Sequence, residues 1–301
     1  MLKKHKILIT GVAGFIGSQI CKKLVKKNFS IIGIDDLSVG KKKNIPNGIK
    51  FYKFDLSNYK KFNKLPKCDY ILHLAGQSSG DISFDDPIID LKKNTQSTLN
   101  LIKYGIKCKA KKIIYASSMS VYGDLEKKKY SEKLISDPKS CYGVSKLSSE
   151  IYLKIFSKKL DYVIYRMFNV YGPGQDLDNL RQGMVSIYLS QAIKNKRINV
   201  KGSLDRIRDF VYIDDVVDIW TNSINKKIKN ETINLCTGKP TSVKKLLSFI
   251  KKLVPETKII RQKSTRGDQL KSVGDVNKIN KIFSHKFIPL NVGLKRFFNS
   301  I

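Results

Sequence analysis

The chain lacks a long apolar segment. None of its hydrophobic runs approaches the ~18–20 residues that a membrane-spanning helix requires. The apolar stretch after Lys6 is short and leads directly into a glycine loop, whereas a secretory signal needs a longer apolar region and a cleavage site of small residues. We therefore expect no membrane insertion and a cytoplasmic location.

Cysteine is also scarce. The chain has five cysteines, an odd number, which are widely spaced and form no Cys-x-x-Cys motif. This pattern fits neither a disulfide framework nor a metal site, and it indicates a reducing environment. The cysteines are Cys21, Cys68, Cys108, Cys141 and Cys236.

Acidic residues are few: 25 stand against 58 basic residues, which gives a net charge of +33. Such a charge is typical of proteins that bind nucleic acid or acidic membranes. However, only eight of the basic residues are arginine, the residue better suited to bidentate phosphate recognition, and the lysines are spread along the whole chain. We interpret the charge as a general enrichment in lysine without a nucleic-acid partner, and weak polyanion binding stays open as the alternative.

Apolar residues are plentiful, at 41% of the chain, and over its first two thirds they follow two alternating patterns. Short runs rich in Ile, Val, Leu and aromatic residues predict buried parallel strands, and the amphipathic stretches between them predict helices. This alternation predicts an α/β fold with a Rossmann-type, doubly wound parallel sheet. The expected strands are Lys6–Ile9, Ser30–Ile34, Ile49–Phe54, Tyr70–Leu74, Lys112–Ala116 and Tyr162–Tyr165, and the expected helices are Phe15–Lys27, Pro87–Tyr104 and Tyr142–Lys158.

The pattern changes after about Gly172. We interpret residues 1–172 as a Rossmann domain to which later segments return, and residues 173–301 as mainly a smaller, partly interleaved α/β lobe. The expected elements of this lobe are a helix at Leu180–Asn195, a strand pair formed by Ile198–Val200 and Asp209–Tyr212, a helix at Asp214–Asn225, a strand at Thr232–Leu235, a helix at Ser242–Leu253, a strand near Ile259 and two final helices.

A glycine loop follows the first expected strand. It reads Thr10-Gly11-Val12-Ala13-Gly14-Phe15-Ile16-Gly17 and opens the first expected helix. Its glycines allow a tight turn and let backbone N–H groups approach a pyrophosphate at the helix N-terminus. The second strand ends in Asp35, 18 residues after Gly17, where a carboxylate accepts hydrogen bonds from an adenosine ribose and repels a 2′-phosphate. The loop and the aspartate together predict a site for NAD rather than NADP.

Two further strands end in segments that should lie at the same edge of the sheet. Asp55 and Leu56 follow the third strand, and the segment 74–76 follows the fourth. Ligands of such folds bind at the carboxyl ends of the strands. Asp55 is therefore a candidate contact to adenine, and a simple role in capping the following turn stays open as the alternative.

A tyrosine and a lysine lie four residues apart, at Tyr142 and Lys146, and so share one face of an expected helix. A nearby ammonium favours a phenolate, which would let Tyr142 act as a base near neutral pH. In a lysine-rich chain this spacing also arises by chance on an exposed helix. Ser118 favours the catalytic interpretation, because a hydroxyl directly after the fifth strand would point into the ligand crevice.

With these motifs the chain resembles the extended short-chain dehydrogenases/reductases, and within them the NAD-dependent nucleotide-sugar 4-epimerases. The resemblance extends over nearly the whole length. Besides the glycine loop and the pair Tyr142 and Lys146, it rests on segments 35–40, 73–76, 94–95, 117–123, 166–173 and 208–215.

The resemblance implies catalytic and cofactor-binding roles. Tyr142 would be the acid/base, Lys146 its partner and Ser118 a hydroxyl that contacts the substrate. Residues 1–172 would bind NAD, and the smaller lobe would bind the substrate. The residues implied in NAD binding are Gly11, Ala13, Gly14, Phe15, Ile16, Gly17, Asp35, Asp36, Ser38, Asp55, Leu56, Leu74, Ala75, Gly76, Asn94, Ala116, Tyr142, Lys146 and Phe168.

The substrate implied by the resemblance is a UDP- or other nucleotide-diphosphate hexose. Asn169, Arg208 and Arg266 would hold its diphosphate, which a planar guanidinium suits; an ion pair with a neighbouring aspartate is the alternative for Arg208. Ser272 stands at the position that resembles the size gate of the family, so its small side chain predicts room for an N-acetylated hexose. The loop 77–81 departs from the usual epimerase loop, which leaves the hexose open.

The implied reaction is epimerisation at the sugar C4 through a transient 4-keto intermediate with tightly bound NAD. Family 4,6-dehydratases carry an Asp-Glu pair after the substrate hydroxyl, and decarboxylases carry a glutamate at the second of these positions. Met119 and Ser120 stand there, which disfavours both reactions. Two alternatives stay open: an NAD-dependent sugar-nucleotide 4-dehydrogenase or ketoreductase, and a non-catalytic, polyanion-binding derivative of the fold.

A homodimer is also implied. In relatives the helices that correspond to Pro87–Tyr104 and Tyr142–Lys158 pair with their symmetry mates in a four-helix bundle. Apolar residues occur on both segments, although they would equally serve the core: Ile88, Leu91, Leu99, Leu101, Leu147, Ile151 and Ile155.

Overall fold

A seven-stranded sheet forms the centre of the computed structural model, which describes residues 5–124, 129–264 and 270–301. Its strand order is β11-β6-β5-β4-β1-β2-β3, and all neighbouring pairs are parallel. The doubly wound α/β fold is therefore confirmed. The strands are β1 (Lys6–Thr10), β2 (Ser30–Asp35), β3 (Lys50–Lys53), β4 (Tyr70–His73), β5 (Lys112–Ser118), β6 (Asp161–Met167) and β11 (Glu231–Leu235).

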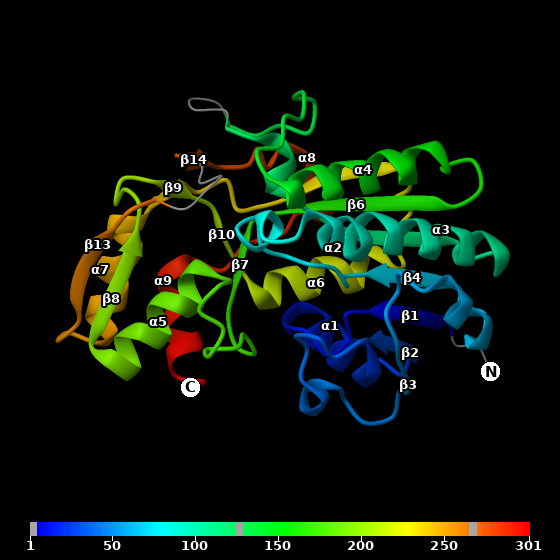
Figure 1. The fold of residues 1–301 in the computed structure, drawn as a ribbon, viewed down its shortest axis with the longest axis horizontal. Helices are drawn as coiled ribbons and strands as arrows, with labels where there is room; N and C mark the ends of the chain where they lie inside the picture. The colour runs from blue at the N-terminus through cyan, green and yellow to red at the C-terminus, as the bar shows by residue number, and fades with distance from the viewer. Residues whose placement is uncertain (1–4, 125–128, 265–269) are drawn as a thin grey trace.

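Helices cover both faces of this sheet because successive strand residues point to opposite faces. In β1, Ile9 packs in one hydrophobic cluster with Ile20 of α1 and Trp220 of α6. Leu8 belongs to a second cluster with Leu101 of α3. The helices that flank the sheet are α1 (Phe15–Lys26), α2 (Pro87–Leu91), α3 (Ser97–Lys107), α4 (Cys141–Ile155) and α6 (Ile213–Ser223) (Figure 1).

The strand order reverses between β1 and β4. From β1 the chain proceeds outward through β2 to β3, and from β4 it proceeds the other way through β5 and β6 to β11. Ligands of doubly wound sheets bind at such a switch point, beyond the carboxyl ends of the strands. We therefore expect a binding site beside the carboxyl ends of β1, β2, β4 and β5.

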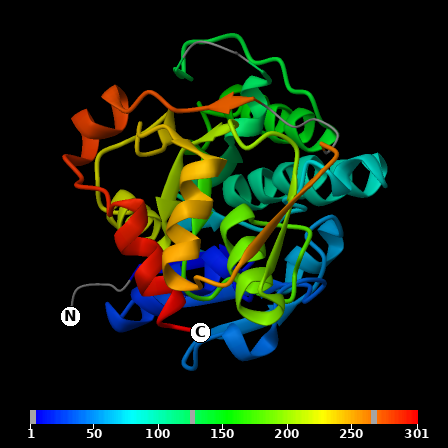
Figure 2. The ribbon, with the colours of Figure 1, turned by 90° about the vertical axis from the view of Figure 1, so that its left-hand side faces the viewer.

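Most of the remaining elements form a smaller lobe on one side of the central sheet, whereas α8 packs against β11 of the sheet itself (Figure 1). Figure 2 faces this lobe and shows α7 and α9 side by side. No helix in the described ranges has the length and apolar character needed to cross a membrane. The remaining elements are β7 (Asn169–Tyr171), α5 (Met184–Asn195), β8 (Arg197–Lys201), β9 (Ile207–Arg208), β10 (Phe210–Tyr212), β12 (Thr241–Ser242), α7 (Val243–Leu253), β13 (Lys258–Gln262), β14 (Lys271–Ser272), α8 (Asn277–Phe283) and α9 (Leu290–Phe298).

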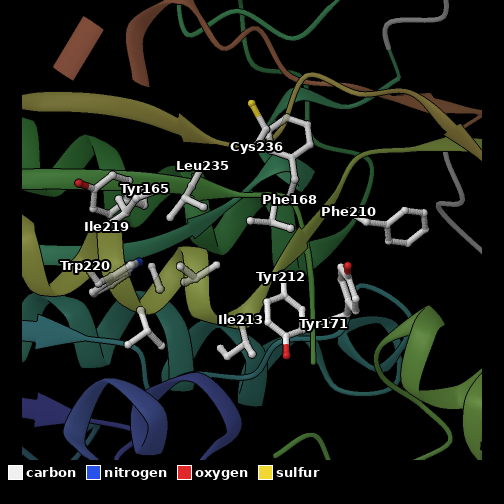
Figure 3. Packing of buried hydrophobic residues seen from close by; sticks show 14 of the residues in the cluster. Tyr165, Phe168, Tyr171, Phe210, Tyr212, Ile213, Ile219, Trp220, Leu235 and Cys236 are labelled. Carbon is white, nitrogen blue, oxygen red and sulfur yellow. The ribbon is translucent and has the colours of Figure 1, made fainter. Parts of the chain in front are cut away.

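The lobe and the sheet share a hydrophobic core. One cluster contains Tyr165 of β6 and Trp220 of α6, whose rings are 5.5 Å apart, and continues to Leu247 of α7 and Phe297 of α9. Figure 3 shows the junction, where Tyr165 of β6 lies beside Trp220 of α6, and Tyr171 of β7 lies beside Tyr212 of β10. The division into residues 1–172 and 173–301 stays a prediction.

Two details of the predicted fold are wrong. The expected pairing of 198–200 with 209–212 does not form; β8 pairs in parallel with β13, and β10 pairs with β7. Apolar alternation identifies a strand but not its partner, which for β8 lies far downstream. The expected single helix Pro87–Tyr104 is divided into α2 and α3 by a π-helical segment, η4 (Lys92–Gln96).

Candidate active site

A cleft of about 490 Å³ lies at the carboxyl ends of the central strands. Its wall combines the glycine loop, the segments after β2, β3 and β4, the end of β5, and one face of α4. Most residues predicted to bind a dinucleotide line it: Gly11, Ala13, Gly14, Phe15, Ile16, Gly17, Asp35, Asp36, Ser38, Asp55, Leu56, Leu74, Ala75, Gly76, Ala116, Tyr142 and Lys146.

The loop between β1 and α1 is so tight that two of its glycines admit no side chain. A Cβ on Gly17 would collide with the carbonyl oxygen of Gly11, and a Cβ on Gly11 would lie 2.8 Å from the amide nitrogen of Ala75. Gly11 also has a φ of +70°, which favours glycine. Among the described residues, no side chain caps the N-terminus of α1 at Gly14, an arrangement that suits a bound phosphate group.

Asp35 ends β2 and is held by the same loop. One carboxylate oxygen accepts a hydrogen bond from the amide of Ala13 at 2.9 Å, and the other accepts one from the amide of Leu37 at 2.9 Å. Burial raises the pKa of Asp35, and the two backbone donors act in the opposite direction. The carboxylate therefore has a fixed orientation at the cleft wall, as the predicted contact with a ribose requires.

A lysine that the sequence analysis missed stands near Asp35. Nζ of Lys93 lies 2.5 Å from a carboxylate oxygen of Asp36 and 2.8 Å from one of Asp55, and all three side chains line the cleft. Burial acts to raise the pKa of Asp36 and of Asp55, but hydrogen bonds, including those from Lys93, lower both pKa values overall. In a chain with so many lysines, no pattern in the sequence distinguishes Lys93.

Two residues predicted to bind the cofactor do not line the cleft. Asn94 lies in η4, where its amide nitrogen donates to Asp90 at 3.1 Å and its oxygen packs against Gly76, so it supports the cleft wall from behind. Phe168 is buried in the core, where its ring lies 6.2 Å from that of Tyr130 (Figure 3). An aromatic residue one position after a strand can point to either side, and here packing directs the side chain inward.

Ser118, Tyr142 and Lys146 are brought together at the end of β5. Nζ of Lys146 donates a hydrogen bond to the carbonyl oxygen of Ala116 at 3.0 Å and lies 5.6 Å from the centre of the Tyr142 ring. The Ser118 side chain acts to lower the pKa of Tyr142, its Oγ donates to Oγ of Ser120 at 3.1 Å, and it does not line the cleft. The three groups come from β5 and α4, and Tyr142 and Lys146 reach the cleft from one face of the helix, as their spacing predicts.

The expected effect of Lys146 on Tyr142 is absent in this structure. Burial raises the pKa of Tyr142 to about 12, while the Ser118 side chain acts to lower it. Burial lowers the pKa of Lys146 to about 8, against the charges of Asp90 and Glu150. Lys146 therefore loses its proton at a lower pH than Tyr142. In the protein without ligands, desolvation of both groups outweighs their mutual attraction, and Tyr142 stays a phenol near neutral pH.

Asp90 and Glu150 are two acids near Lys146 that the sequence analysis missed. Neither is exposed to solvent, and the charge of each raises the pKa of Lys146 against the effect of burial. Acids on helical segments are usually exposed, so their positions in α2 and α4 carry no signal in the sequence. The charges of these two buried acids therefore offset part of the effect that burial has on the pKa of Lys146.

The low pKa of Lys146 predicts a rise in stability with pH. Because the pKa falls from 10.5 to about 8 on folding, the unfolded chain binds more protons between these two values. The free energy of unfolding of the cofactor-free protein should therefore rise by ~2 kcal/mol from pH 8 to pH 10 on account of this group. Denaturant unfolding across this range measures it, and Lys146→Met should remove that part of the rise. Equal pH dependence of the two proteins would contradict the prediction.

The residues predicted to hold a diphosphate lie toward the smaller lobe. Asn169 begins β7, and its side-chain amide donates to the carbonyl oxygen of Asp209 at 2.9 Å. Arg208 is buried at the end of β9. Ser272, which is fully buried, lies opposite Arg208 in the neighbouring strand β14. The structure places these three close together but does not bring them to the wall of the 490 Å³ cleft. Arg266 lies outside the described residues.

A segment of the smaller lobe, residues 174–182, forms a wall of the cleft that the sequence analysis missed. Nε2 of Gln182 donates to Oγ of Ser78 at 2.7 Å, and Nζ of Lys41 lies 2.8 Å from a carboxylate oxygen of Asp176. These contacts join the two sides of the cleft. The segment has no regular structure and no apolar periodicity, so the sequence offers no signal for it.

The family model described as the NAD dependent epimerase/dehydratase family matches residues 7–236. The chain belongs to this family. The match includes every strand of the central sheet except the first residue of β1, and it includes Ser118, Tyr142 and Lys146. The predicted family and the predicted NAD dependence of the enzyme are therefore confirmed.

Individual members of the family match over nearly the whole chain. A putative UDP-glucose 4-epimerase of Methanocaldococcus jannaschii is 33% identical over 97% of each chain. A crystal structure of UDP-glucose 4-epimerase from Thermotoga maritima with UDP-glucose has 33% identity and a TM-score of 0.94 over 98% of each chain. The UDP-glucose 4-epimerase of Thermus thermophilus, solved in complex with NAD, has 26% identity and a TM-score of 0.89 over 98% of each chain.

The cleft fits the NAD that this family requires. The turn around Gly11 and Gly17 leaves no room for side chains and brings backbone N–H groups to the end of α1. Asp35 presents a fixed carboxylate at one end of the cleft, and Tyr142 and Lys146 stand at the same cleft wall. In a family member built this way, the glycine loop would hold the pyrophosphate and Asp35 the adenosine ribose.

Proposed function

We propose that this family member is a nucleotide-sugar 4-epimerase whose substrate is a UDP-hexose. The observation that carries the proposal is the pair Tyr142 and Lys146 at the wall of a cleft that fits NAD, with Ser118 at the end of β5 acting on Tyr142. The relatives and structures named as UDP-glucose 4-epimerases support it. Met119 and Ser120 also support it, because neither offers the carboxylic acid that elimination of water would need.

In the proposed reaction Tyr142 exchanges a proton with the 4-hydroxyl of the sugar. Ser118, whose side chain acts to lower the pKa of Tyr142, would orient the same hydroxyl, while Lys146 is held in place by the carbonyl oxygen of Ala116. Bound NAD would supply the acceptor for the carbon-bound hydrogen and a positive charge that favours the phenolate. Because the pKa of Tyr142 is about 12 without ligands, Tyr142 accepts a proton only once bound ligands have lowered that pKa.

Residues that bind the diphosphate must hold the nucleotide while the 4-keto sugar rotates between its formation and its reduction. We assign this role to Asn169 and Arg208, with Arg266 as a third contributor, because guanidinium and amide donors suit phosphate oxygens. Ser272, which is paired with Arg208, has a small side chain. We therefore still predict that the enzyme accepts an N-acetylated hexose.

The direct test uses purified protein without added cofactor. The substrates are UDP-galactose, UDP-glucose and the corresponding UDP-N-acetylhexosamines, and NMR reads the configuration at C4 of the products. Interconversion of C4 epimers without lasting NADH absorbance is the expected result. A keto sugar that accumulates together with NADH would instead identify a 4-dehydrogenase and overturn the epimerase proposal.

Replacement of Asp35 by serine is expected to weaken NAD binding by about 10- to 100-fold, because a charged acceptor is lost from the proposed ribose site. It should also narrow the preference for NAD over NADP, since the carboxylate no longer repels a 2′-phosphate. Calorimetric titration with both dinucleotides measures the two effects. Glu256→Ser, at an exposed glutamate paired with Lys196 and away from the cleft, is the control and should bind like the wild type. Unchanged discrimination in Asp35→Ser would contradict the assignment.

We propose further that the protein is a homodimer built on α2 and α4. These helices pack against each other and carry apolar side chains that stay exposed in one chain. Leu101, by contrast, serves the core and is fully buried. A second copy of the chain, joined through the same helices, would cover the patch. The exposed residues are Ile88 (61%), Ile89 (50%), Leu91 (50%), Val144 (51%), Ile151 (48%) and Ile155 (64%).

Sedimentation of variants tests the dimer. The double substitution Ile151→Lys and Ile155→Lys is expected to give monomers at concentrations where the wild type is dimeric. It places like charges of the two copies against each other in the proposed interface of α2 and α4. Ile135→Lys, at an apolar residue that is 89% exposed and outside the patch, is the control and should remain dimeric. A wild type that sediments as a monomer would contradict the proposal.

A further inference from the structure

Two cysteines that are far apart in the sequence lie together at the edge of the sheet opposite the cleft. Cys68 precedes β4, Cys108 follows α3, and their sulfur atoms are 3.9 Å apart. Tyr70 and Lys112, the first residues of β4 and β5, are paired there, so this is the amino-terminal edge of the sheet. The cysteine pair is therefore separate from the active site.

The two thiols are chemically unequal. Cys68 is buried, whereas Cys108 is partly exposed. A hydrogen bond with Cys68 lowers the pKa of Cys108 to about 6; backbone hydrogen bonds with Cys68 and Ala110 act in the same direction, and burial opposes them. The same arrangement raises the pKa of Cys68. Cys108 is thus the accessible and more acidic thiol, and Cys68 is the buried partner, with its sulfur 3.9 Å away.

The surroundings of Cys108 favour attack by a thiolate. The exposed Lys107 and Lys109 flank it, and a positive environment stabilises the anion. The hydroxyl of Tyr104 donates to the carbonyl oxygen of Pro66 at 2.6 Å, which ties the end of α3 to the segment that carries Cys68. The sulfur atoms must approach to about 2.05 Å to bond. Rotation of side chains at the end of a helix can supply this movement.

We propose that Cys68 and Cys108 form a reversible intramolecular disulfide with a low-molecular-weight disulfide, such as oxidised glutathione, as the oxidant. The Cys108 thiolate attacks one glutathione sulfur, forms a mixed disulfide and releases the other glutathione as a thiolate. That thiolate takes the proton of Cys68, whose sulfur then displaces the second glutathione from Cys108. The second glutathione also leaves as a thiolate and takes a proton from solvent, to which Cys108 had earlier given its own. In all, the two protein thiols lose two electrons and two protons, and one oxidised glutathione becomes two reduced molecules.

The disulfide would stabilise the fold and leave the active site intact. It would close a loop that contains β4, α2 and α3, and cross-links of this length restrict the unfolded chain. We expect a rise in Tm of roughly 5 °C on oxidation. Turnover of the oxidised protein should match that of the reduced protein, because the cross-link lies at the opposite edge of the sheet.

Incubation of the full-length protein in glutathione buffers of increasing oxidation tests the proposal. Free thiols are alkylated, and mass spectrometry of proteolytic peptides identifies each linkage. The expected product is a peptide pair joined through Cys68 and Cys108. In Cys68→Ser the reaction should stop at a glutathione adduct on Cys108. Cys141→Ser, at the other partly exposed cysteine, is the matched control and should still form the disulfide.

Two results would overturn the proposal. One is a wild type that accumulates glutathione adducts on Cys108, or disulfides between chains, without the internal cross-link. The other is a Cys108 that reacts no faster than Cys141 in the wild type. Both readouts use the wild-type protein, so they do not depend on the folding of any variant.

Discussion

Replacement of Tyr142 by phenylalanine is expected to reduce sugar-nucleotide turnover by about 100- to 10,000-fold, the range that a positioned acid/base contributes. The substitution removes only the phenolic oxygen, and the ring is 8% exposed, so the packing of α4 is retained. NAD binding should change little, because the glycine loop and Asp35 are untouched. The variant should therefore separate proton transfer from cofactor binding.

The measurement pairs turnover with cofactor content. Initial rates are followed by NMR, and the NAD released on denaturation is quantified for each protein. Tyr152→Phe is the matched control, since Tyr152 lies on the same helix but packs in the hydrophobic cluster away from the cleft. A Tyr142→Phe variant that turns over within a few-fold of the wild type would remove the tyrosine from the mechanism.

The parts of the site that could be predicted from the sequence are those that lie at strand ends. Because parallel strands direct their carboxyl ends to one edge, a glycine loop after β1, Asp35 at the end of β2 and Ser118 at the end of β5 must lie near one another. The helical spacing then directs Tyr142 and Lys146 to the same cleft. Each of these predictions needed only the order of the strands and the period of a helix.

The parts that could not be predicted depend on packing across the chain. Lys93 joins Asp36 and Asp55 through contacts that no local pattern signals. The segment 174–182 reaches the cleft only because the smaller lobe packs against the sheet. The pKa of Tyr142 without ligands could not be predicted for a related reason, because the spacing to Lys146 indicates attraction but says nothing of desolvation. Burial, which decides that pKa, is a property of the whole fold.

A buried ion pair supports the helix that carries the proposed catalytic residues. Glu150 of α4 accepts hydrogen bonds from Nε and Nη2 of Arg166 in β6 at 3.0 and 2.7 Å, and from Oγ of Ser117 in β5 at 2.5 Å. The side chains of Glu150 and Arg166 are 0% and 4% exposed. The pair therefore fixes α4 to two strands, one helical turn from Lys146.

Replacement of Glu150 by alanine is expected to lower the free energy of unfolding by about 3–5 kcal/mol, because it leaves the guanidinium of Arg166 buried without a counter-charge. The double variant Glu150→Leu with Arg166→Met should recover most of this loss, since it buries no unpaired charge. Denaturant unfolding of the cofactor-free proteins measures both. The control is Asp178→Ala, which breaks the exposed pair with Lys194 and should change stability little.

If Glu150→Ala resembled this control, water would have to reach Arg166, and the ion pair of Glu150 and Arg166 could not hold α4 against the sheet. The prediction thus tests whether the helix that bears Tyr142 and Lys146 is positioned by a desolvated charge or by apolar packing alone.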